Sequence, residues 1–264
     1  MIRLVALDLD GTLISSTLQI SQRVQTTIAR AREAGIVFTM VTGRMFAAAR
    51  PFAVAVGIDG PIVCYQGAAI YVVKTGERLA HHPLDTRVAQ HVFATAVSDG
   101  VRALGYCDDN LYAEAIDKYT KEYTDLARVK VNLVPSLIEF FRARASTKVV
   151  CVTDLEKADA YVERLKALLD SSGYVTRSQP QFVEVLNPTI DKGRALAVIG
   201  NYYGAAAQET MAIGDSWNDV PLLTAAGKAV AMGTAPPELL AAADAVVAGV
   251  EGDGVAEALE RFVL

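Results

Sequence analysis

The chain has 264 residues, 52% hydrophobic and 21% charged, which is the composition of a globular protein large enough for one big domain or two smaller ones. Its formal net charge of -5 gives no reason to expect nucleic acid or a membrane surface as a partner. No apolar run approaches the ~20 residues of a membrane-spanning helix, and a charged motif follows Met1 too soon for a signal peptide. The three cysteines are far apart and odd in number, so we expect reduced thiols and a cytoplasmic protein.

Strands and helices are predicted to alternate along the first 80 residues. Apolar runs predict buried strands at residues 2–7, 36–41, 61–65 and 70–73. A helix is expected over 21–34, with Ser21 as its N-cap and Gly35 as its stop. A second helix is expected over 45–56, where Pro51 either kinks or divides it.

The same alternation is predicted to resume near residue 190. Helices are expected over 192–203, 219–226 and 236–243, and a last helix is expected to end at 262. Strands are expected at 209–213, 228–231 and 245–247. Because each predicted strand is a continuous apolar run, we predict an α/β fold with a parallel sheet covered on both faces. This core comprises residues 1–81 plus 188–264.

The middle of the chain, residues 82–187, is predicted to be a separate α+β insert. Strands are expected at 147–152, 174–177 and 182–186, and helices at 85–98 and 155–169. None of these strands ends in an acidic-Gly or Gly-Asp motif. The candidate catalytic and binding residues are therefore expected in the core.

Polar clusters follow three strands of the predicted core. They are Asp8 with Asp10, then Thr42 with Gly43, and the segment Gly214-Asp215-Ser216-Trp217-Asn218-Asp219. Ligands of an open parallel sheet bind beyond the carboxyl ends of its strands, so these clusters are expected to converge on one edge.

A metal site is the first chemistry that these clusters suggest. Asp8 and Asp10 are two residues apart, so their carboxylates point the same way on an extended chain and repel unless a cation lies between them. With Asp215 they form an oxygen-rich set suited to magnesium. Taken alone, the first motif is also compatible with an ordinary turn at the end of a strand.

Phosphate binding is the second chemistry that these clusters suggest. Gly11-Thr12 and Thr42-Gly43 combine glycine amides with hydroxyl groups, and Thr42 precedes a predicted helix whose free amides would favour an anion. Lys192 is expected in the first turn of a helix, against the preference of the helix dipole, which points to a functional role.

Taken in order, these motifs resemble those of the haloacid dehalogenase superfamily, and most closely the Cof-type phosphatases with an inserted type C2 cap. The motifs are Asp8-Leu9-Asp10-Gly11-Thr12, Thr42-Gly43-Arg44, Lys192-Gly193 and the segment 214–219. The segment Glu251-Gly252-Asp253-Gly254 also resembles the ending of that subfamily. Gln66 departs from the pattern, since the subfamily usually has asparagine there, and its role is left open. The resemblance covers the whole chain and implies a Rossmann-like core.

The resemblance also implies a role for each matching position. Asp8 would be the nucleophile that becomes an aspartyl-phosphate, and Asp10 the general acid and base. Magnesium would be held by the Asp8 and Asp215 carboxylates and the Asp10 carbonyl oxygen. Asp219 would orient Lys192 or metal-bound water. The phosphate would be held by Leu9, Thr42, Gly43, Lys192 and Asn218.

The predicted function is therefore a magnesium-dependent phosphatase acting on small phosphorylated metabolites, with the insert as a cap that contacts the leaving group. Two alternatives stay open: a phosphomutase, and a non-enzymatic module that is only phosphorylated on aspartate. Possible specificity contacts in the insert, equally compatible with a strand edge, are Tyr106, Asp108, Asn110 and Tyr112.

Overall fold

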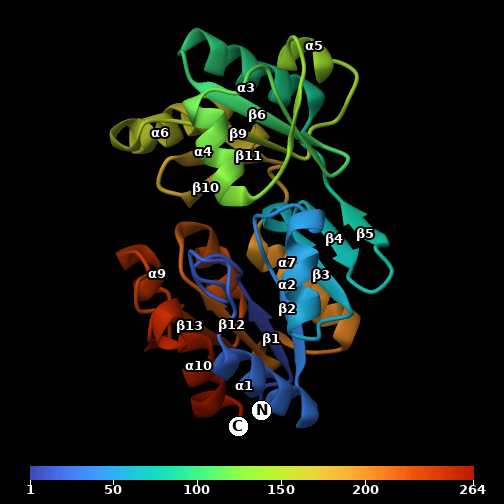
Figure 1. Ribbon diagram of the computed structural model, residues 1–264, viewed down its shortest axis with the longest axis vertical. Coiled ribbons are helices and arrows are strands. Elements are labelled where there is room, and N and C mark those ends of the chain that lie inside the picture. The colour runs from blue at the N-terminus through green and yellow to red at the C-terminus, as the bar shows by residue number, and fades with distance from the viewer. The chain divides into compact units, whose positions relative to one another are not determined.

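The computed structural model describes residues 1–264 and divides the chain into two compact units (Figure 1). The core unit comprises residues 1–43, 49–79 and 191–264, and the inserted unit comprises 44–48 and 80–190. The boundaries predicted from sequence lie at 81/82 and 187/188. None of the helices is long and apolar enough to cross a membrane.

The core unit is built on a five-stranded parallel sheet, as predicted, with the order β14-β13-β12-β1-β2. Its strands are β1 (Leu4–Leu7), β2 (Val37–Met40), β12 (Thr210–Gly214), β13 (Lys228–Met232) and β14 (Ala245–Val247). Every residue of β1 is 0% exposed, because this central strand is covered on both faces. Figure 1 shows β1 between β2 and β12.

The strand order reverses direction between β1 and β12. From β1 the chain adds β2 on one side, whereas the later strands β12, β13 and β14 extend the sheet on the other side. Such a reversal leaves a crevice beyond the carboxyl ends of the two central strands, where open α/β sheets bind ligands. Asp8 follows β1, and Gly214 is the last residue of β12.

Helices cover the parallel sheet. They are α1 (Gln22–Glu33), α2 (Phe46–Ala55), α7 (Lys192–Tyr203), α8 (Val220–Ala225), α9 (Pro237–Ala241) and α10 (Gly254–Phe262). The N-cap predicted for α1 is present, since the Ser21 hydroxyl accepts the Val24 amide at 3.1 Å. α1 lies against α10, and α7 packs on β1 and α8. Pro51 lies within α2 without dividing it.

The strands predicted at 61–65 and 70–73 do not extend the parallel sheet. β3 (Pro61–Cys64) and β4 (Ala69–Val72) pair antiparallel, and with β5 (Arg78–His81) they form a three-stranded sheet. The connection η1 (Tyr65–Gly67) is too short for the crossover that parallel strands need, and its first two residues have left-handed φ angles of 52° and 59°. β3 meets the large sheet through a bridge between Val41 and Val63 and through the Thr39 hydroxyl, which donates to the Pro61 carbonyl at 2.9 Å.

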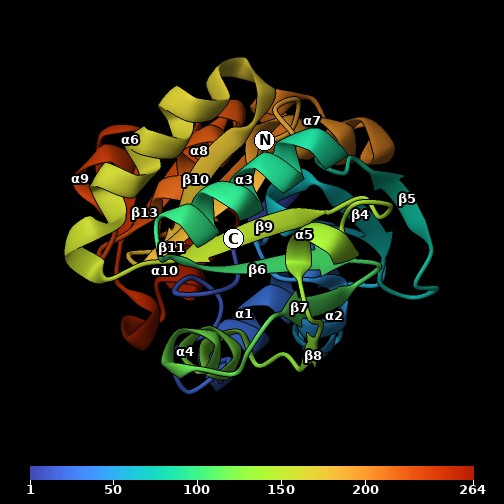
Figure 2. The same ribbon diagram turned by 90° about the horizontal axis from the view of Figure 1, so that it is seen from above.

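The inserted unit is an α+β structure around a six-stranded sheet with the order β10-β11-β9-β6-β7-β8. Its strands are β6 (Arg102–Cys107), β7 (Asn110–Ala113), β8 (Val131–Leu133), β9 (Lys148–Val152), β10 (Tyr174–Gln179) and β11 (Phe182–Leu186). Its helices are α3 (Thr86–Ser98), α4 (Lys118–Ala127), α5 (Leu137–Phe140) and α6 (Ala158–Leu169). α3 packs on β6 and β9, and α6 on β10 and β11 (Figure 2).

Candidate active site

A buried ion-pair network occupies the crevice beyond β1 and β12. The ammonium nitrogen of Lys192 lies 2.5 Å from Oδ1 of Asp8 and 2.6 Å from Oδ1 of Asp219. The side chains of these three residues are 1%, 7% and 0% exposed, respectively. The structure therefore brings together groups from three distant parts of the sequence, as the motif order predicted.

The start of α7 positions Lys192. Asp191 is the N-cap, and its carboxylate accepts the Arg194 amide at 2.7 Å. Gly193, the residue after Lys192, lies so close to α8 that a Cβ atom would be 2.3 Å from the carbonyl oxygen of Pro221. This tight packing fixes the first turn of α7 and carries the lysine into the crevice.

Asp219 holds both the lysine and the loop after β12. Its Oδ2 accepts the amides of Asp215 and Ser216, each at 3.1 Å, while its Oδ1 accepts Lys192. The residue ends a short 3-10 turn, η5 (Trp217–Asp219). Because both of its oxygens are occupied within the protein, Asp219 is a positioning group.

Asp215 is tied to the first motif. The Thr12 hydroxyl donates to its Oδ1 at 3.2 Å. Gly11 has a left-handed φ of 79°, and a Cβ atom at this position would lie 2.2 Å from Oδ2 of Asp215. Glycine is therefore needed here both for its backbone angle and for the close approach of the carboxylate.

Gln66, whose role the sequence left open, supports the side of the crevice near Thr42. Its backbone amide donates to the Thr42 carbonyl at 3.0 Å. Its side-chain oxygen accepts a hydrogen bond from the side-chain nitrogen Nδ2 of Asn218 at 2.9 Å. Gln66 is 0% exposed, and a Cβ on Gly43 would lie 2.3 Å from its amide nitrogen. The side-chain oxygen of Asn218 is buried without a partner.

The charges in this network do not balance. Three buried or half-buried carboxylates, those of Asp8, Asp215 and Asp219, face the single ammonium group of Lys192. Burial, followed by the charge of Asp219, raises the pKa of Asp8 well above its usual value and that of Asp215 to about 7. Burial would lower the pKa of Lys192, but the carboxylates of Asp219 and Asp8 raise it instead. A divalent cation would supply the missing positive charge.

The donor set fits one cation. Carboxylate oxygens of Asp8, Asp215 and Asp219 lie within 4.8 Å of one another, and hard divalent ions prefer oxygen ligands. Since Asp219 is already committed, Asp8 and Asp215 are the carboxylates best able to bind a metal ion. The carboxylate of Asp10 is not a member of this group.

Two other residues of the first motif lie where the chain leaves β1. The carbonyl oxygen of Leu9 accepts the amides of Leu13 and Ile14, both at 2.9 Å, so the chain folds back immediately after Asp8. Asp10 is half-buried and bridges to Ile14. The prediction that the Asp8 and Asp10 carboxylates share one volume assumed an extended chain, whereas the chain turns here.

The predicted helix after Thr42 does not offer free amides to an anion at its start. α2 begins four residues later, and the amides of Phe46 and Ala47 donate to the Asp109 carboxylate at 3.0 and 2.9 Å. A carboxylate of the protein therefore occupies this helix N-terminus, where the sequence suggested a phosphate.

Two of the candidate specificity residues make packing contacts inside the inserted unit. The Tyr106 hydroxyl is 3.0 Å from that of Tyr123, and Tyr106 is 2% exposed. The Tyr112 ring lies 4.3 Å from the ring of Phe140, at the edge of the apolar core. Asp108 and Asn110 flank the turn between β6 and β7, where the Asn110 side chain donates to the Asp108 carbonyl at 2.8 Å.

This crevice, with its lysine and carboxylates, matches a known family. Residues 5–259 match the model of the haloacid dehalogenase-like hydrolases. The chain belongs to that family. The predicted membership of the haloacid dehalogenase superfamily, Cof type, is therefore confirmed, and so is the α/β core with an inserted domain.

Curated relatives and solved structures agree with this assignment. The phosphoglycolate phosphatase of Methanothermobacter thermautotrophicus is 29% identical over 261 residues, with 99% of each chain covered. The HMP-PP phosphatase of Cronobacter sakazakii is 30% identical over 251 residues, covering 91% of this chain and 88% of that one. A haloacid dehalogenase-like hydrolase from Bacteroides thetaiotaomicron superposes with a TM-score of 0.86 at 30% identity and 99% coverage of both chains. The prediction of a haloacid dehalogenase-type phosphatase is confirmed at the level of enzyme class.

Proposed function

We propose that this hydrolase is a magnesium-dependent phosphatase that cleaves small phosphorylated metabolites through an aspartyl-phosphate formed on Asp8. The observation that carries the proposal is the ion-pair network of Asp8, Lys192 and Asp219 at the reversal point of the sheet, with Asp215 beside it. It combines a carboxylate nucleophile, a fixed positive charge and an incomplete cation site in one crevice.

In the proposed reaction, an oxygen of Asp8 attacks phosphorus while the bond to the leaving oxygen breaks. Water then attacks the aspartyl-phosphate, releasing phosphate and restoring the Asp8 carboxylate. Lys192 contributes a positive charge next to the reacting group, and Asp219 keeps that charge in place through its 2.6 Å contact.

The residues present fit a magnesium ion. Its ligands would be the Asp8 and Asp215 carboxylates with the backbone carbonyl oxygen of Asp10, as the family resemblance implies. When bound, the ion supplies positive charge that offsets the carboxylates and the transferring phosphoryl group. Thr12 holds Asp215 ready for this role through its 3.2 Å hydrogen bond.

The proposed phosphate contacts come from backbone amides and side chains around Asp8. They are the Leu9 and Gly43 amides, the Thr42 hydroxyl, the Lys192 ammonium and the Asn218 side chain. Gln66 fixes Asn218 by accepting its amide at 2.9 Å. We propose Gln66 as a positioning residue for this contact.

Asp10 is the proposed general acid and base. It would protonate the leaving oxygen in the first step and take a proton from the attacking water in the second. Its half-buried side chain is not part of the group formed by the Asp8, Asp215 and Asp219 carboxylates.

For the substrate we propose small phosphorylated metabolites, because the two curated relatives named above carry names of phosphatases for small molecules. We further propose that residues 82–187 act as a cap that contacts the leaving group, and that the enzyme works in the cytoplasm.

The test is a phosphate-release screen across phosphorylated metabolites, with magnesium and with EDTA, using the wild type and Asp8→Asn. We expect metal-dependent release that Asp8→Asn abolishes and that the exposed control Asp59→Asn retains. Full activity of Asp8→Asn would refute the assignment of the nucleophile. Transfer of phosphate to a second sugar hydroxyl, without phosphate release, would favour the phosphomutase instead.

A further inference from the structure

The chain changes unit immediately after the proposed phosphate contacts Thr42 and Gly43. Residues up to Gly43 belong to the core unit, whereas residues 44–48 group with the inserted unit. The core side is well fixed, since the Thr42 amide donates to the Val63 carbonyl and the Thr42 carbonyl accepts the Gln66 amide, both at 3.0 Å. What fixes the chain beyond Gly43 is a separate question.

Two contacts within the inserted unit hold this next stretch. Arg44 is 9% exposed, and its guanidinium donates at 3.3 Å to the carbonyl of Ala127, the last residue of α4. The amides of Phe46 and Ala47 donate to Oδ1 and Oδ2 of Asp109, at 3.0 and 2.9 Å. A cation thus lies at the C-terminus of one helix and a carboxylate at the N-terminus of another, where the helix dipoles favour each charge.

The start of α2 has no cap from its own neighbourhood. The residue before Phe46 is Met45, and methionine is not among the residues that cap helices. The first amides of a helix have no partner inside it. Asp109, which lies 63 positions further along the chain, supplies the cap that the local sequence lacks.

The turn that carries Asp109 is itself unfavourable for an aspartate. Asp108 and Asp109 form the turn between β6 and β7, and both have left-handed φ angles, of 46° and 56°. Tight hairpin turns of this kind favour glycine at the second position. Aspartate there costs backbone energy that glycine would avoid, and such strain is concentrated at functional sites. The position therefore points to a use for the carboxylate.

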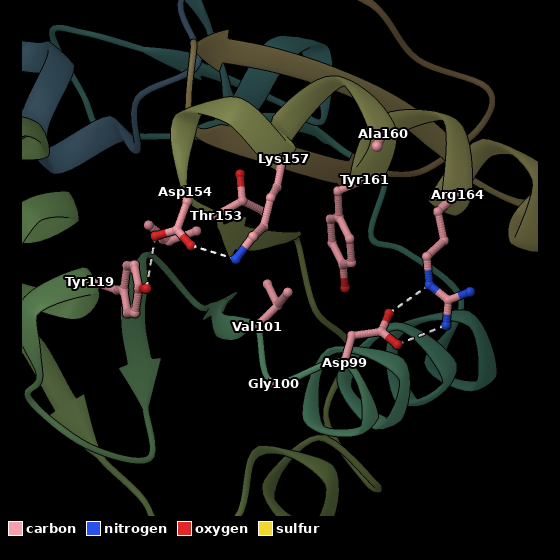
Figure 3. Close-up of a pocket in the computed structure, with 11 residues that line it drawn as sticks. Asp99, Gly100, Val101, Tyr119, Thr153, Asp154, Lys157, Ala160, Tyr161 and Arg164 are labelled. Atoms are coloured by element: carbon pink, nitrogen blue, oxygen red, sulfur yellow. Dashed lines mark hydrogen bonds and ion pairs between the residues drawn. The ribbon is translucent and has the colours of Figure 1, made fainter.

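The helix that receives Arg44 is anchored within the inserted unit. Asp117 caps its start by accepting the Thr120 amide at 2.9 Å. Figure 3 shows a second tie, in which the Tyr119 hydroxyl donates to Asp154, at 2.9 Å. Arg44 is therefore held by an element that is fixed at its other end.

We propose that Asp109 is a positioning residue for phosphate binding: by capping α2 it fixes the segment that follows Gly43, so that the contacts of Thr42 and Gly43 with a phosphoryl group depend on the inserted unit. This inference rests on the proposed function, which supplies those phosphate contacts. It assigns a role to a carboxylate that lies outside the buried ion-pair network. Asp109 touches no reacting atom and acts through the backbone.

The test compares three variants of the full chain with the wild type. Asp109→Gly removes the carboxylate and relaxes the turn, so the variant is expected to fold. Asp109→Asn keeps one acceptor oxygen and tolerates the left-handed backbone. The matched control is Asp170→Gly, which replaces an exposed aspartate that also has a positive φ, of 47°, in the inserted unit.

The probe is orthovanadate, which mimics the transferring phosphoryl group, and its Kd is measured by calorimetry in magnesium. Asp109→Gly should weaken vanadate binding and lower kcat/KM, each about tenfold. Asp109→Asn should stay within about threefold of the wild type, and Asp170→Gly should match it. A merely unfolded fraction would instead lower kcat and leave KM and the vanadate Kd unchanged.

Hydrogen exchange of the Phe46 and Ala47 amides reads the same coupling from the other side. Because coupling between two sites is reciprocal, vanadate should slow their exchange in the wild type by up to the same factor. It should have no such effect in Asp109→Gly. A helix cap with a purely structural role would not respond to vanadate.

Three results would overturn the proposal: Asp109→Gly matching Asp170→Gly in vanadate affinity, no recovery in Asp109→Asn, or equal protection by vanadate in Asp109→Gly and wild type. The failure of the proposed function is distinguishable. If the wild type does not bind vanadate, both proposals fall together. If it does and Asp109→Gly binds equally well, this inference alone falls.

Discussion

The ammonium group of Lys192 and the carboxylate of Asp219 form a completely buried ion pair, with 2.6 Å between Nζ and Oδ1. Lys192 also contacts Asp8, so one lysine joins the proposed nucleophile to the residue that fixes the loop carrying Asp215. Stability and reactivity of this crevice therefore depend on the same charge.

We predict that Lys192→Met lowers the free energy of unfolding by about 3 kcal/mol or more, because it leaves buried carboxylates without a counter-charge. Magnesium should restore part of this loss. Urea unfolding in EDTA and in magnesium measures both effects, with exposed Lys74→Met as the control. A loss below about 1 kcal/mol in EDTA would show that the buried charges are compensated in some other way.

Gly11→Ala should weaken magnesium binding at least about tenfold, a loss of roughly 1.4 kcal/mol. An added Cβ would lie 2.2 Å from Oδ2 of Asp215, and the residue has a φ of 79°. Gly35→Ala is a matched control, since its φ is 90° and no atom lies within 4 Å of its added Cβ. Both variants should lose about 1 kcal/mol of stability from backbone strain. Equal magnesium affinity of the two, measured by calorimetry, would contradict the role assigned to the close contact.

Asp10→Ala should slow substrates with poor leaving groups by about 10²–10⁴-fold, because they need a proton from the general acid. Aryl phosphates with acidic phenols should suffer much less in the first step. The measurement is kcat/KM across a series of leaving groups, with the exposed Asp59→Ala as the control. An equal loss for good and poor leaving groups would remove Asp10 from the acid role.

Asp117, the N-cap of α4, should make the protein less stable in acid. Burial would raise the pKa of its carboxyl, but the Thr120 amide at 2.9 Å and the Arg102 guanidinium at 2.6 Å lower it overall. Because the pKa is lower in the folded state than in the unfolded state, the stabilisation is complete above a pH of about 4. It is lost as the pH falls through the folded-state value.

We therefore expect Asp117→Ala to cost about 1–2 kcal/mol at pH 7, from the lost cap and ion pair. The difference from wild type should shrink as the pH falls below about 4, the value for an unfolded aspartate. Thermal unfolding across the pH range measures it, and exposed Asp125→Ala, on the same helix, is the control. A difference that does not change with pH would mean that the carboxylate charge is not involved.

The parallel core could be predicted because strands buried on both faces leave continuous apolar runs, as in residues 4–7 and 210–214. The residues after those runs were also identifiable, since strand ends in such a sheet face a common edge. Lys192 was recognisable from its unfavourable position at a helix start.

Other features depend on local turns that an apolar pattern does not reveal. Residues 61–64 are as apolar as a parallel strand, but the left-handed Tyr65 and Gln66 send the chain back beside them. Likewise the chain turns after Asp8, and the clustered carboxylates are those of Asp8, Asp215 and Asp219.

The pairing of β1 with β12 places Leu4 opposite Thr210. During synthesis, β1 therefore emerges long before its partner β12, which leaves the ribosome only after almost four-fifths of the chain has been made. The inserted unit is nearly continuous in sequence, since all of it except residues 44–48 lies within 80–190, and it has its own apolar core, so it can fold in the meantime. We expect the inserted unit to form first on the ribosome, while the nascent edge of β1 stays exposed to chaperones until the last strands arrive.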